Sequence, residues 1–158
     1  MSQVLFVCLG NICRSPAAEA VMNKLIEKND LSEKISCDSA GTSSYHVGGP
    51  ADSRMRKVAQ QRGFDITSIS RQINYNDLDQ FDYIIAMDQS NYYDIRAIDR
   101  KTDYLDKIFQ LKDFCLQHQI TGVPDPYYGG QEGFDLVIDI LEDGCQELLN
   151  KIRSENNL

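Results

Sequence analysis

The sequence has little of what metal and nucleotide sites need. It contains two histidines, His46 and His118, and no H-E-x-x-H motif. Its single Lys-Thr pair, Lys101-Thr102, has no glycine-rich approach, so the nucleotide-binding pattern G-x-x-x-x-G-K-[ST] is absent. A zinc enzyme, a dinuclear metal enzyme and a P-loop nucleotide-binding protein are therefore disfavoured, and each histidine is better explained as a surface or loop residue.

Long apolar runs and excess positive charge are also missing. No segment approaches the roughly 20 apolar residues of a membrane span, and no basic signal-peptide start precedes Cys8. The formal net charge of −8 argues against a nucleic-acid partner and against long-range attraction of an acidic substrate. An anion site would need a local basic patch. Five cations are candidates for it, although a solvated helix face is the simpler explanation for most of them: Arg54, Arg56, Lys57, Arg62 and Arg71.

Composition and cysteine usage indicate one domain with reduced thiols. The 158 residues, 42% hydrophobic and 25% charged, are ordinary for a globular protein and contain no repeat or linker. We therefore expect residues 1–158 to form a single catalytic domain. The five cysteines, an odd number without a secretion signal, favour a cytoplasmic location. Cys8 and Cys13 stand apart from the others, because a tight loop could bring them together.

Alternating strand and helix patterns predict an α/β fold. Strands are expected at residues 3–8, 35–40, 82–87 and 106–111, with helices at 16–28, 51–62, 89–99 and 133–153. This alternation predicts a single parallel sheet with helices on both faces, and such sheets bind ligands beyond the C-terminal ends of their strands. The last helix has the clearest apolar stripe, with Cys145 beside it: Val137, Ile140, Leu141, Gly144, Leu148 and Ile152.

One segment, CLGNICRS at residues 8–15, combines a nucleophile with an anion site. It follows an apolar strand and precedes Pro16, which suits the first position of a helix. The loop would therefore offer its backbone N–H groups beside a helix N-terminus, which favours bound anions and the thiolate form of Cys8. Arg14 can grip a phosphate with two parallel hydrogen bonds. A buried strand-end cysteine and a surface arginine would be the alternative explanation.

A second loop, VPDPYYGG at residues 123–130, holds Asp125 between two prolines. Asp-Pro alone is a common turn dipeptide. Beside Cys8, however, it suggests a mechanism, because a cysteine that displaces an alcohol from phosphate needs an acid to protonate the leaving oxygen. The ionised aspartate could then activate the water that attacks the cysteinyl-phosphate, and Ser15 could donate its hydroxyl to the departing thiolate. The adjacent Tyr127 and Tyr128 could wall a pocket for an aromatic ring or pack on the surface.

With these motifs in order, the chain resembles the low-molecular-weight protein tyrosine phosphatases. The resemblance covers essentially the full length and rests on residues 8–15 (CLGNICRS), 38–42 (DSAGT), 87–91 (MDQSN) and 125–128 (DPYY). It implies a flavodoxin-like, four-stranded parallel α/β fold with no metal and no organic cofactor. It also implies hydrolysis of phosphotyrosine in proteins, or of small aryl phosphates, with inorganic phosphate as product. We expect a cytoplasmic monomer, or a weakly self-associating protein, that binds neither nucleic acid nor membranes.

The resemblance also implies roles for individual residues. Cys8 would be the nucleophile, Arg14 the phosphate clamp, Asp125 the general acid and then base, and Ser15 the donor to the thiolate. The phosphate would lie against the loop residues Leu9, Gly10, Asn11, Ile12, Cys13 and Arg14.

Supporting roles follow from the same resemblance. Asn11 would hold a strained backbone conformation, which asparagine tolerates, with Ser39 hydrogen-bonded to it. Cys13 would form a reversible disulfide with Cys8. The substrate cleft would be lined by Ile12, Tyr45, His46, Tyr127 and Tyr128.

Two departures and three competing functions remain. Ser68 stands where many members have a loop-bracing histidine. His46 lies where the family varies, so the substrate preference of other members cannot be transferred to this chain.

An arsenate reductase would need a relay of cysteines, but Cys37, Cys115 and Cys145 are widely separated. A phosphoarginine phosphatase would favour threonine in place of Ile12. A module that only binds phosphotyrosine would need neither a thiol nor an acid.

Overall fold

The computed structural model describes all 158 residues and contains one four-stranded parallel sheet. Its strands are β1 (Ser2–Cys8), β2 (Ile35–Gly41), β3 (Tyr83–Ala86) and β4 (Ile108–Gln110), in the order β2-β1-β3-β4. The predicted α/β fold is therefore confirmed, with the third and fourth strands shorter than expected. The order reverses beside β1, so Cys8 lies at the crevice where such sheets bind ligands.

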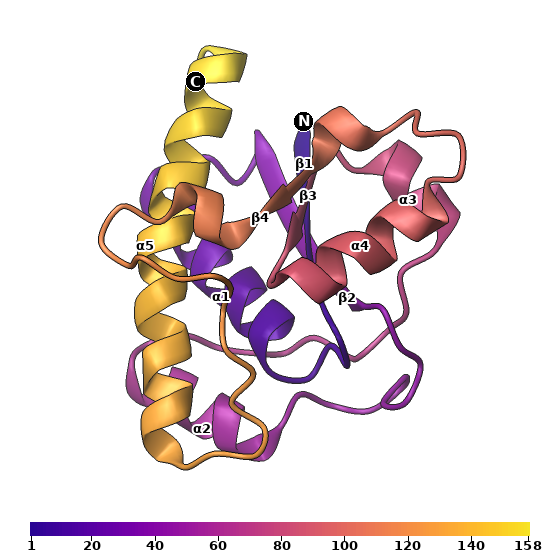
Figure 1. The fold of residues 1–158 in the computed structure, drawn as a ribbon. Helices are drawn as coiled ribbons and strands as arrows, with labels where there is room; N and C mark the ends of the chain where they lie inside the picture. The colour runs from indigo at the N-terminus through magenta and orange to yellow at the C-terminus, as the bar shows by residue number, and fades with distance from the viewer.

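Helices cover both faces of the sheet (Figure 1). The helices α1 (Arg14–Lys28), α2 (Ser53–Gln61) and α5 (Gln131–Asn156) enclose the larger core, whereas α3 (Tyr75–Gln80) and α4 (Gln89–Ile98) enclose the smaller one. Alternate residues of β1 supply the two cores, Val4 and Phe6 on one face and Leu5 and Val7 on the other. Burial on both faces explains why this strand is a continuous apolar run.

Several helix boundaries differ from the prediction. α1 begins at Arg14, so Pro16 occupies the third helical position and the expected first position is wrong. This is tolerated because first-turn N–H groups have no acceptor inside their own helix. α3 and two 3₁₀ segments, Leu105–Lys107 and Leu111–Phe114, were not predicted, because such short elements show no clear period. None of the helices combines the length and apolar character needed to cross a bilayer.

Local signals explain how α2 is placed beside the loop that follows β1. The Asp52 side chain caps α2 by accepting hydrogen bonds from the N–H groups of Arg54 and Met55, and Gly63, with φ of +88°, follows its end. The backbone N–H of Asp52 also donates to the carbonyl of Ile12 at 2.8 Å. One residue therefore starts the helix and ties it to the loop.

Candidate active site

The loop between β1 and α1 has free N–H groups and occupied carbonyls. No backbone N–H of residues 9–15 donates a hydrogen bond within the protein. The carbonyls instead accept hydrogen bonds from neighbouring segments: Cys8 from Thr42 N–H (2.9 Å), Leu9 from Ser43 N–H (2.9 Å), Gly10 from the Ser70 hydroxyl (3.0 Å) and Ile12 from Asp52 N–H. This arrangement fixes the loop from outside and leaves its N–H groups to a bound anion.

A close approach of backbones at the end of β2 supports this loop. A Cβ atom on Gly41 would lie 2.8 Å from the carbonyl oxygen of Leu9, which is closer than side-chain carbons pack. Gly41 is therefore required for its lack of a side chain.

Cys8 ends β1 at the base of this loop. The residue is 3% exposed, and its sulfur lies 3.0 Å from the hydroxyl oxygen of Ser15, in the first turn of α1. The Ser15 oxygen already accepts a hydrogen bond from Asn11 at 2.8 Å, so its own proton can be donated either to the sulfur of Cys8 or to the carbonyl of Ala40, which is 3.4 Å away. A thiolate there would receive one hydroxyl hydrogen bond.

Arg14 is buried and held by groups from two other segments. Its Nη1 donates to Asp88 Oδ2 at 2.6 Å and to the carbonyl of Val123 at 3.1 Å, and Nη2 lies 3.7 Å from Asp125 Oδ2. Asp88 was not among the predicted site residues. It also caps α4 by accepting the N–H of Asn91, and this capping role is what its position in the sequence indicates.

Asp125 lies across the C-terminal ends of the strands from Cys8. The Val123 N–H donates to the carbonyl of Met87 at 2.8 Å, which anchors the loop beside β3. Asp125 Oδ1 accepts the N–H of Tyr127 at 3.1 Å, and its side chain remains 42% exposed. The carboxyl group is thus oriented by its own turn while still open to a substrate.

These groups meet in one cavity of about 260 Å³. It contains every residue predicted for the substrate cleft and joins Cys8, Arg14 and Asp125, with Ser43 as an unpredicted member. The lining residues are Cys8, Leu9, Gly10, Ile12, Cys13, Arg14, Ser43, Tyr45, His46, Asp125, Tyr127 and Tyr128. A larger hollow of about 550 Å³ between α1 and α5 contains none of them.

Residues 3–158 match the family described as low molecular weight phosphotyrosine protein phosphatase. The chain belongs to this family. The human phosphatase of that name is 41% identical over 152 residues, which cover 94% of each chain. A protein tyrosine phosphatase from Entamoeba histolytica, solved with Hepes in its active site, is 56% identical with a TM-score of 0.95 over the whole of both chains. A drosophila arginine phosphatase is 32% identical with a TM-score of 0.90, covering 99% of this chain and 100% of its own.

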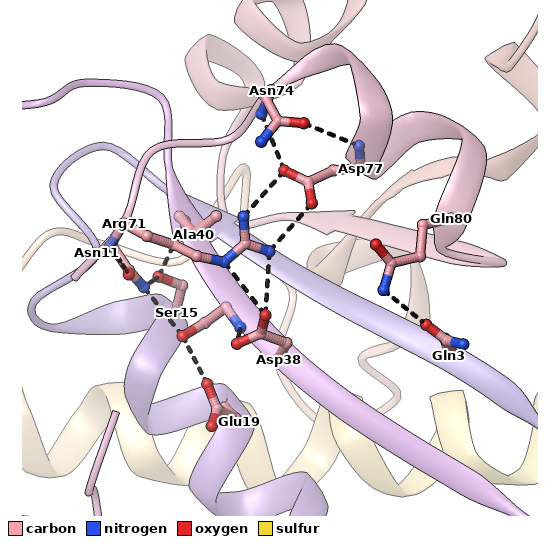
Figure 2. A network of polar contacts seen from close by, with 11 residues as sticks. Gln3, Asn11, Ser15, Glu19, Asp38, Ala40, Arg71, Asn74, Asp77 and Gln80 are labelled. Carbon is pink, nitrogen blue, oxygen red and sulfur yellow. Dashed lines mark hydrogen bonds and ion pairs between the residues drawn. The ribbon is translucent and has the colours of Figure 1, made fainter. Parts of the chain in front are cut away.

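In this low molecular weight phosphatase, Asn11 organises the loop (Figure 2). Its φ of +56° lies in the left-handed region. The side-chain Nδ2 donates to the hydroxyls of Ser15 and of Ser39, the latter at 3.0 Å, while Oδ1 accepts the backbone N–H of Arg71 at 3.0 Å. Every polar atom of the amide is engaged, which fixes its orientation.

A serine on the segment after α2 also braces the loop of this phosphatase. The side chain that contacts the loop is Ser70, which is buried and donates a hydrogen bond to the carbonyl of Gly10, whereas Ser68 forms no side-chain hydrogen bond to the loop. Arg71 adds an ion-pair brace to Asp38 and Asp77, both at 3.0 Å.

The remaining cysteines differ in their relation to the cavity. Cys13 lines it and is buried, and burial together with the negative charges of Asp52 and Cys8 raises the pKa of its thiol. The thiols that lie outside the cavity also have a pKa raised chiefly by burial: Cys37, Cys115 (to about 11) and Cys145.

Proposed function

We propose that this phosphatase hydrolyses phosphotyrosine through a cysteinyl-phosphate intermediate, and that residues 1–158 form one catalytic domain. The observation that carries the proposal is the ring of unpaired N–H groups around the Cys8 thiol, closed on one side by Arg14. Such a ring binds a tetrahedral oxyanion and stabilises the charge that develops on its oxygens during attack.

In the first step, the Cys8 thiolate attacks phosphorus and the bond between phosphorus and the phenolic oxygen breaks. Arg14 would hold two phosphate oxygens, since Asp88 and Val123 occupy only Nη1 and so fix the plane of the guanidinium. Asp125 would give its proton to the departing oxygen, because a phenolate of high basicity leaves slowly without one.

In the second step, water attacks the cysteinyl-phosphate. Asp125, now ionised, would take a proton from this water, and the sulfur–phosphorus bond would break to release inorganic phosphate. The Ser15 hydroxyl, 3.0 Å from the Cys8 sulfur, would donate a hydrogen bond to the thiolate that leaves.

The mouth of the cavity favours an aromatic substrate. Ile12, Tyr127 and Tyr128 offer apolar and aromatic surface around the phosphate site, and the rings of Tyr127 and Tyr128 are 4.9 Å apart at nearly right angles. An aryl ring can pack there, whereas Ile12 has no polar atom for a guanidinium. Phosphotyrosine should therefore be preferred to phosphoarginine, and comparing kcat/KM for the two substrates tests this preference.

The positions of the cysteines fit an arsenate reductase less well than they fit a phosphatase. Cys13 is the single further cysteine in the cavity, and Cys37, Cys115 and Cys145 line no part of it. A relay of thiols from Cys8 would have no third member within the site.

The proposed mechanism is tested by trapping the intermediate. A phosphotyrosine peptide labelled on phosphorus should, after rapid acid quenching, leave label on Cys8 of the parent enzyme and none on Cys8→Ser. The Cys8→Ser variant should still bind inorganic phosphate, because the N–H ring does not depend on the thiol. Near-normal turnover by a folded Cys8→Ser protein would eliminate Cys8 as the nucleophile.

A further inference from the structure

Helix α2 is a basic element in an acidic protein. Its residues include Arg54, Arg56 and Lys57 and no carboxylate, whereas the whole chain has a formal net charge of −8. Figure 1 shows α2 beside the first turns of α5, and the hydrogen bond from Asp52 to Ile12 ties the start of α2 to the loop between β1 and α1, residues 9–13, which we call the phosphate loop because of its proposed role. Positive charge is therefore concentrated beside the catalytic cavity.

Other cations that the sequence offered for a basic patch are neutralised elsewhere. Arg62 pairs with Asp139 and Glu142 on α5, both at 2.6 Å. Arg71 pairs with Asp38 and Asp77 in the brace of the loop. Neither is available to a ligand.

Arg54 forms the wall between the catalytic cavity and a second hollow. It pairs with Asp52 at 2.9 Å and donates to the carbonyl of Tyr127 at 2.9 Å. Its guanidinium carbon lies 5.3 Å from the centre of the Tyr127 ring and 4.9 Å from that of Phe134. Tyr127 faces the catalytic cavity and Phe134 faces the second hollow, so the two spaces are neighbours.

Arg56 and Lys57 are the cations that remain unpaired. Both are exposed and neither has a carboxylate oxygen within 4.0 Å; Arg56 donates only to the carbonyl of Ala51. Lys57 lines the second hollow, which has a volume of about 190 Å³ and a floor that includes Val58 and Phe134.

We propose that the exposed face of α2 and this second hollow bind an acidic stretch of the protein substrate next to its phosphotyrosine. The inference rests on the proposed function of the catalytic cavity. A peptide that leaves the cavity over the wall formed by Arg54 and Tyr127 would reach Lys57 within a few residues, since an extended chain advances about 3.3 Å per residue. Its carboxylates would meet the two unpaired cations, while the remaining acidic surface of the enzyme would repel it from other positions.

The test uses pairs of phosphotyrosine peptides. The two peptides of a pair are identical except at three residues next to the phosphotyrosine, which are all Asp in one peptide and all Asn in the other. One pair carries them before the phosphotyrosine and a second pair after it. For the parent enzyme, kcat/KM should favour the Asp peptide in one of the pairs. The Lys57→Gln variant should lose about two- to fivefold of this preference, the range for a single exposed ion pair, and the loss should diminish at high salt.

Lys28→Gln is the matched control, because it removes the same charge from the end of α1. That end lies 14 residues, or about 21 Å along the helix, from Arg14. The preference of Lys28→Gln for the Asp peptide should equal that of the parent. The double variant Arg56→Gln/Lys57→Gln should lose more of this preference than Lys57→Gln alone.

Three outcomes would overturn the inference. The parent could hydrolyse both peptides of each pair equally well, or Lys28→Gln could lose as much preference as Lys57→Gln, and in either case the proposed function would stand without this docking surface. If no phosphotyrosine peptide is hydrolysed at all, the proposed function fails together with the inference.

Discussion

Asp125 and Cys8 are placed by different kinds of contact, although both face the same cavity. Cys8 is buried and fixed at the end of a strand, next to the Ser15 hydroxyl. Asp125 is 42% exposed and is oriented chiefly by the N–H of Tyr127 in its own turn. This difference suits the roles proposed for them, because a nucleophile needs a defined position, whereas an acid that serves leaving groups and water must stay accessible.

Asp125→Asn should discriminate between leaving groups. The variant should lose about 10²–10⁴-fold in kcat/KM on phosphotyrosine, because the phenolic oxygen needs a proton. The loss should shrink on nitrophenyl phosphate, whose leaving group departs almost unaided. Steady-state kinetics on both substrates measure the contrast, and an equal loss on each would leave Asp125 as a turn residue only.

Mild peroxide should inactivate the enzyme reversibly. Oxidation of Cys8 to a sulfenic acid would allow the Cys13 thiol to displace water and form a disulfide, since both residues line one cavity. Peptide mapping should find the link between Cys8 and Cys13. Cys13→Ser should recover less activity with thiol than the parent, while Cys145→Ser, a control outside the cavity, should recover fully. Equal recovery of Cys13→Ser and the parent would remove Cys13 from this role.

At the scale of elements, the phosphate loop is braced from the segment that leads into α3. Arg71 contacts Asn11 through its backbone and Asp38 and Asp77 through its guanidinium (Figure 2). Asp77 also accepts the N–H of Asn74, so one carboxylate starts α3 and anchors Arg71. The brace therefore links a helix cap, an ion pair and the active-site loop.

Arg71→Gln should weaken both stability and phosphate binding. It removes the charged partner of the Asp77 carboxylate, which is only 6% exposed and keeps the hydrogen bond from Asn74, and this should cost about 1–3 kcal/mol of unfolding free energy after allowance for solvent at Arg71. The inhibition constant for inorganic phosphate should rise as the loop loosens. Denaturant unfolding and inhibition kinetics measure the two effects.

Arg62→Gln is the control for this prediction, because it breaks ion pairs on α5 that do not touch the loop. It should reduce stability with little change in phosphate inhibition. The brace would be refuted if both variants changed phosphate inhibition to the same extent.

For the whole molecule, Asp143 connects α5 to the segment that precedes the Asp125 loop. Its carboxylate accepts the backbone N–H groups of Leu116, Gln117 and His118 at 3.0 Å and lies 2.8 Å from His118 Nδ1. Burial by itself would raise the pKa of Asp143, but these hydrogen bonds outweigh it and hold the pKa below its usual range. The folded state therefore favours the ionised form.

Asp143→Asn should destabilise the protein by about 1–3 kcal/mol at pH 7. A lowered pKa means that the ionised group stabilises the fold above its unfolded-state pKa of about 4, and that this stability is lost as the pH falls through the folded-state pKa. The difference between variant and parent should thus shrink below about pH 4. Urea unfolding across this range measures it, with Glu147→Gln as a control on the same helix; a difference independent of pH would contradict the assignment.

The sequence alone determined what is contiguous along the chain. The strand, loop and helix around residues 8–15 place a thiol, a guanidinium and free N–H groups together, because all of these groups belong to eight consecutive residues. The alternation of strands and helices likewise determined a parallel sheet, since period and burial are local properties. Helix α3, at Tyr75–Gln80, was not predicted, because so short a helix shows no detectable hydrophobic period.

The tertiary structure decided which distant residues meet. Asp88 reaches Arg14 across 74 residues and Ser70 reaches Gly10 across 60, and each also has a plain local interpretation, as a helix cap or a loop serine. Five cations looked equivalent in the sequence, yet Arg62 and Arg71 are neutralised by remote carboxylates while Arg56 and Lys57 remain free. Charge pairing depends on through-space distance, and the sheet order that sets this distance arises only when the whole chain folds.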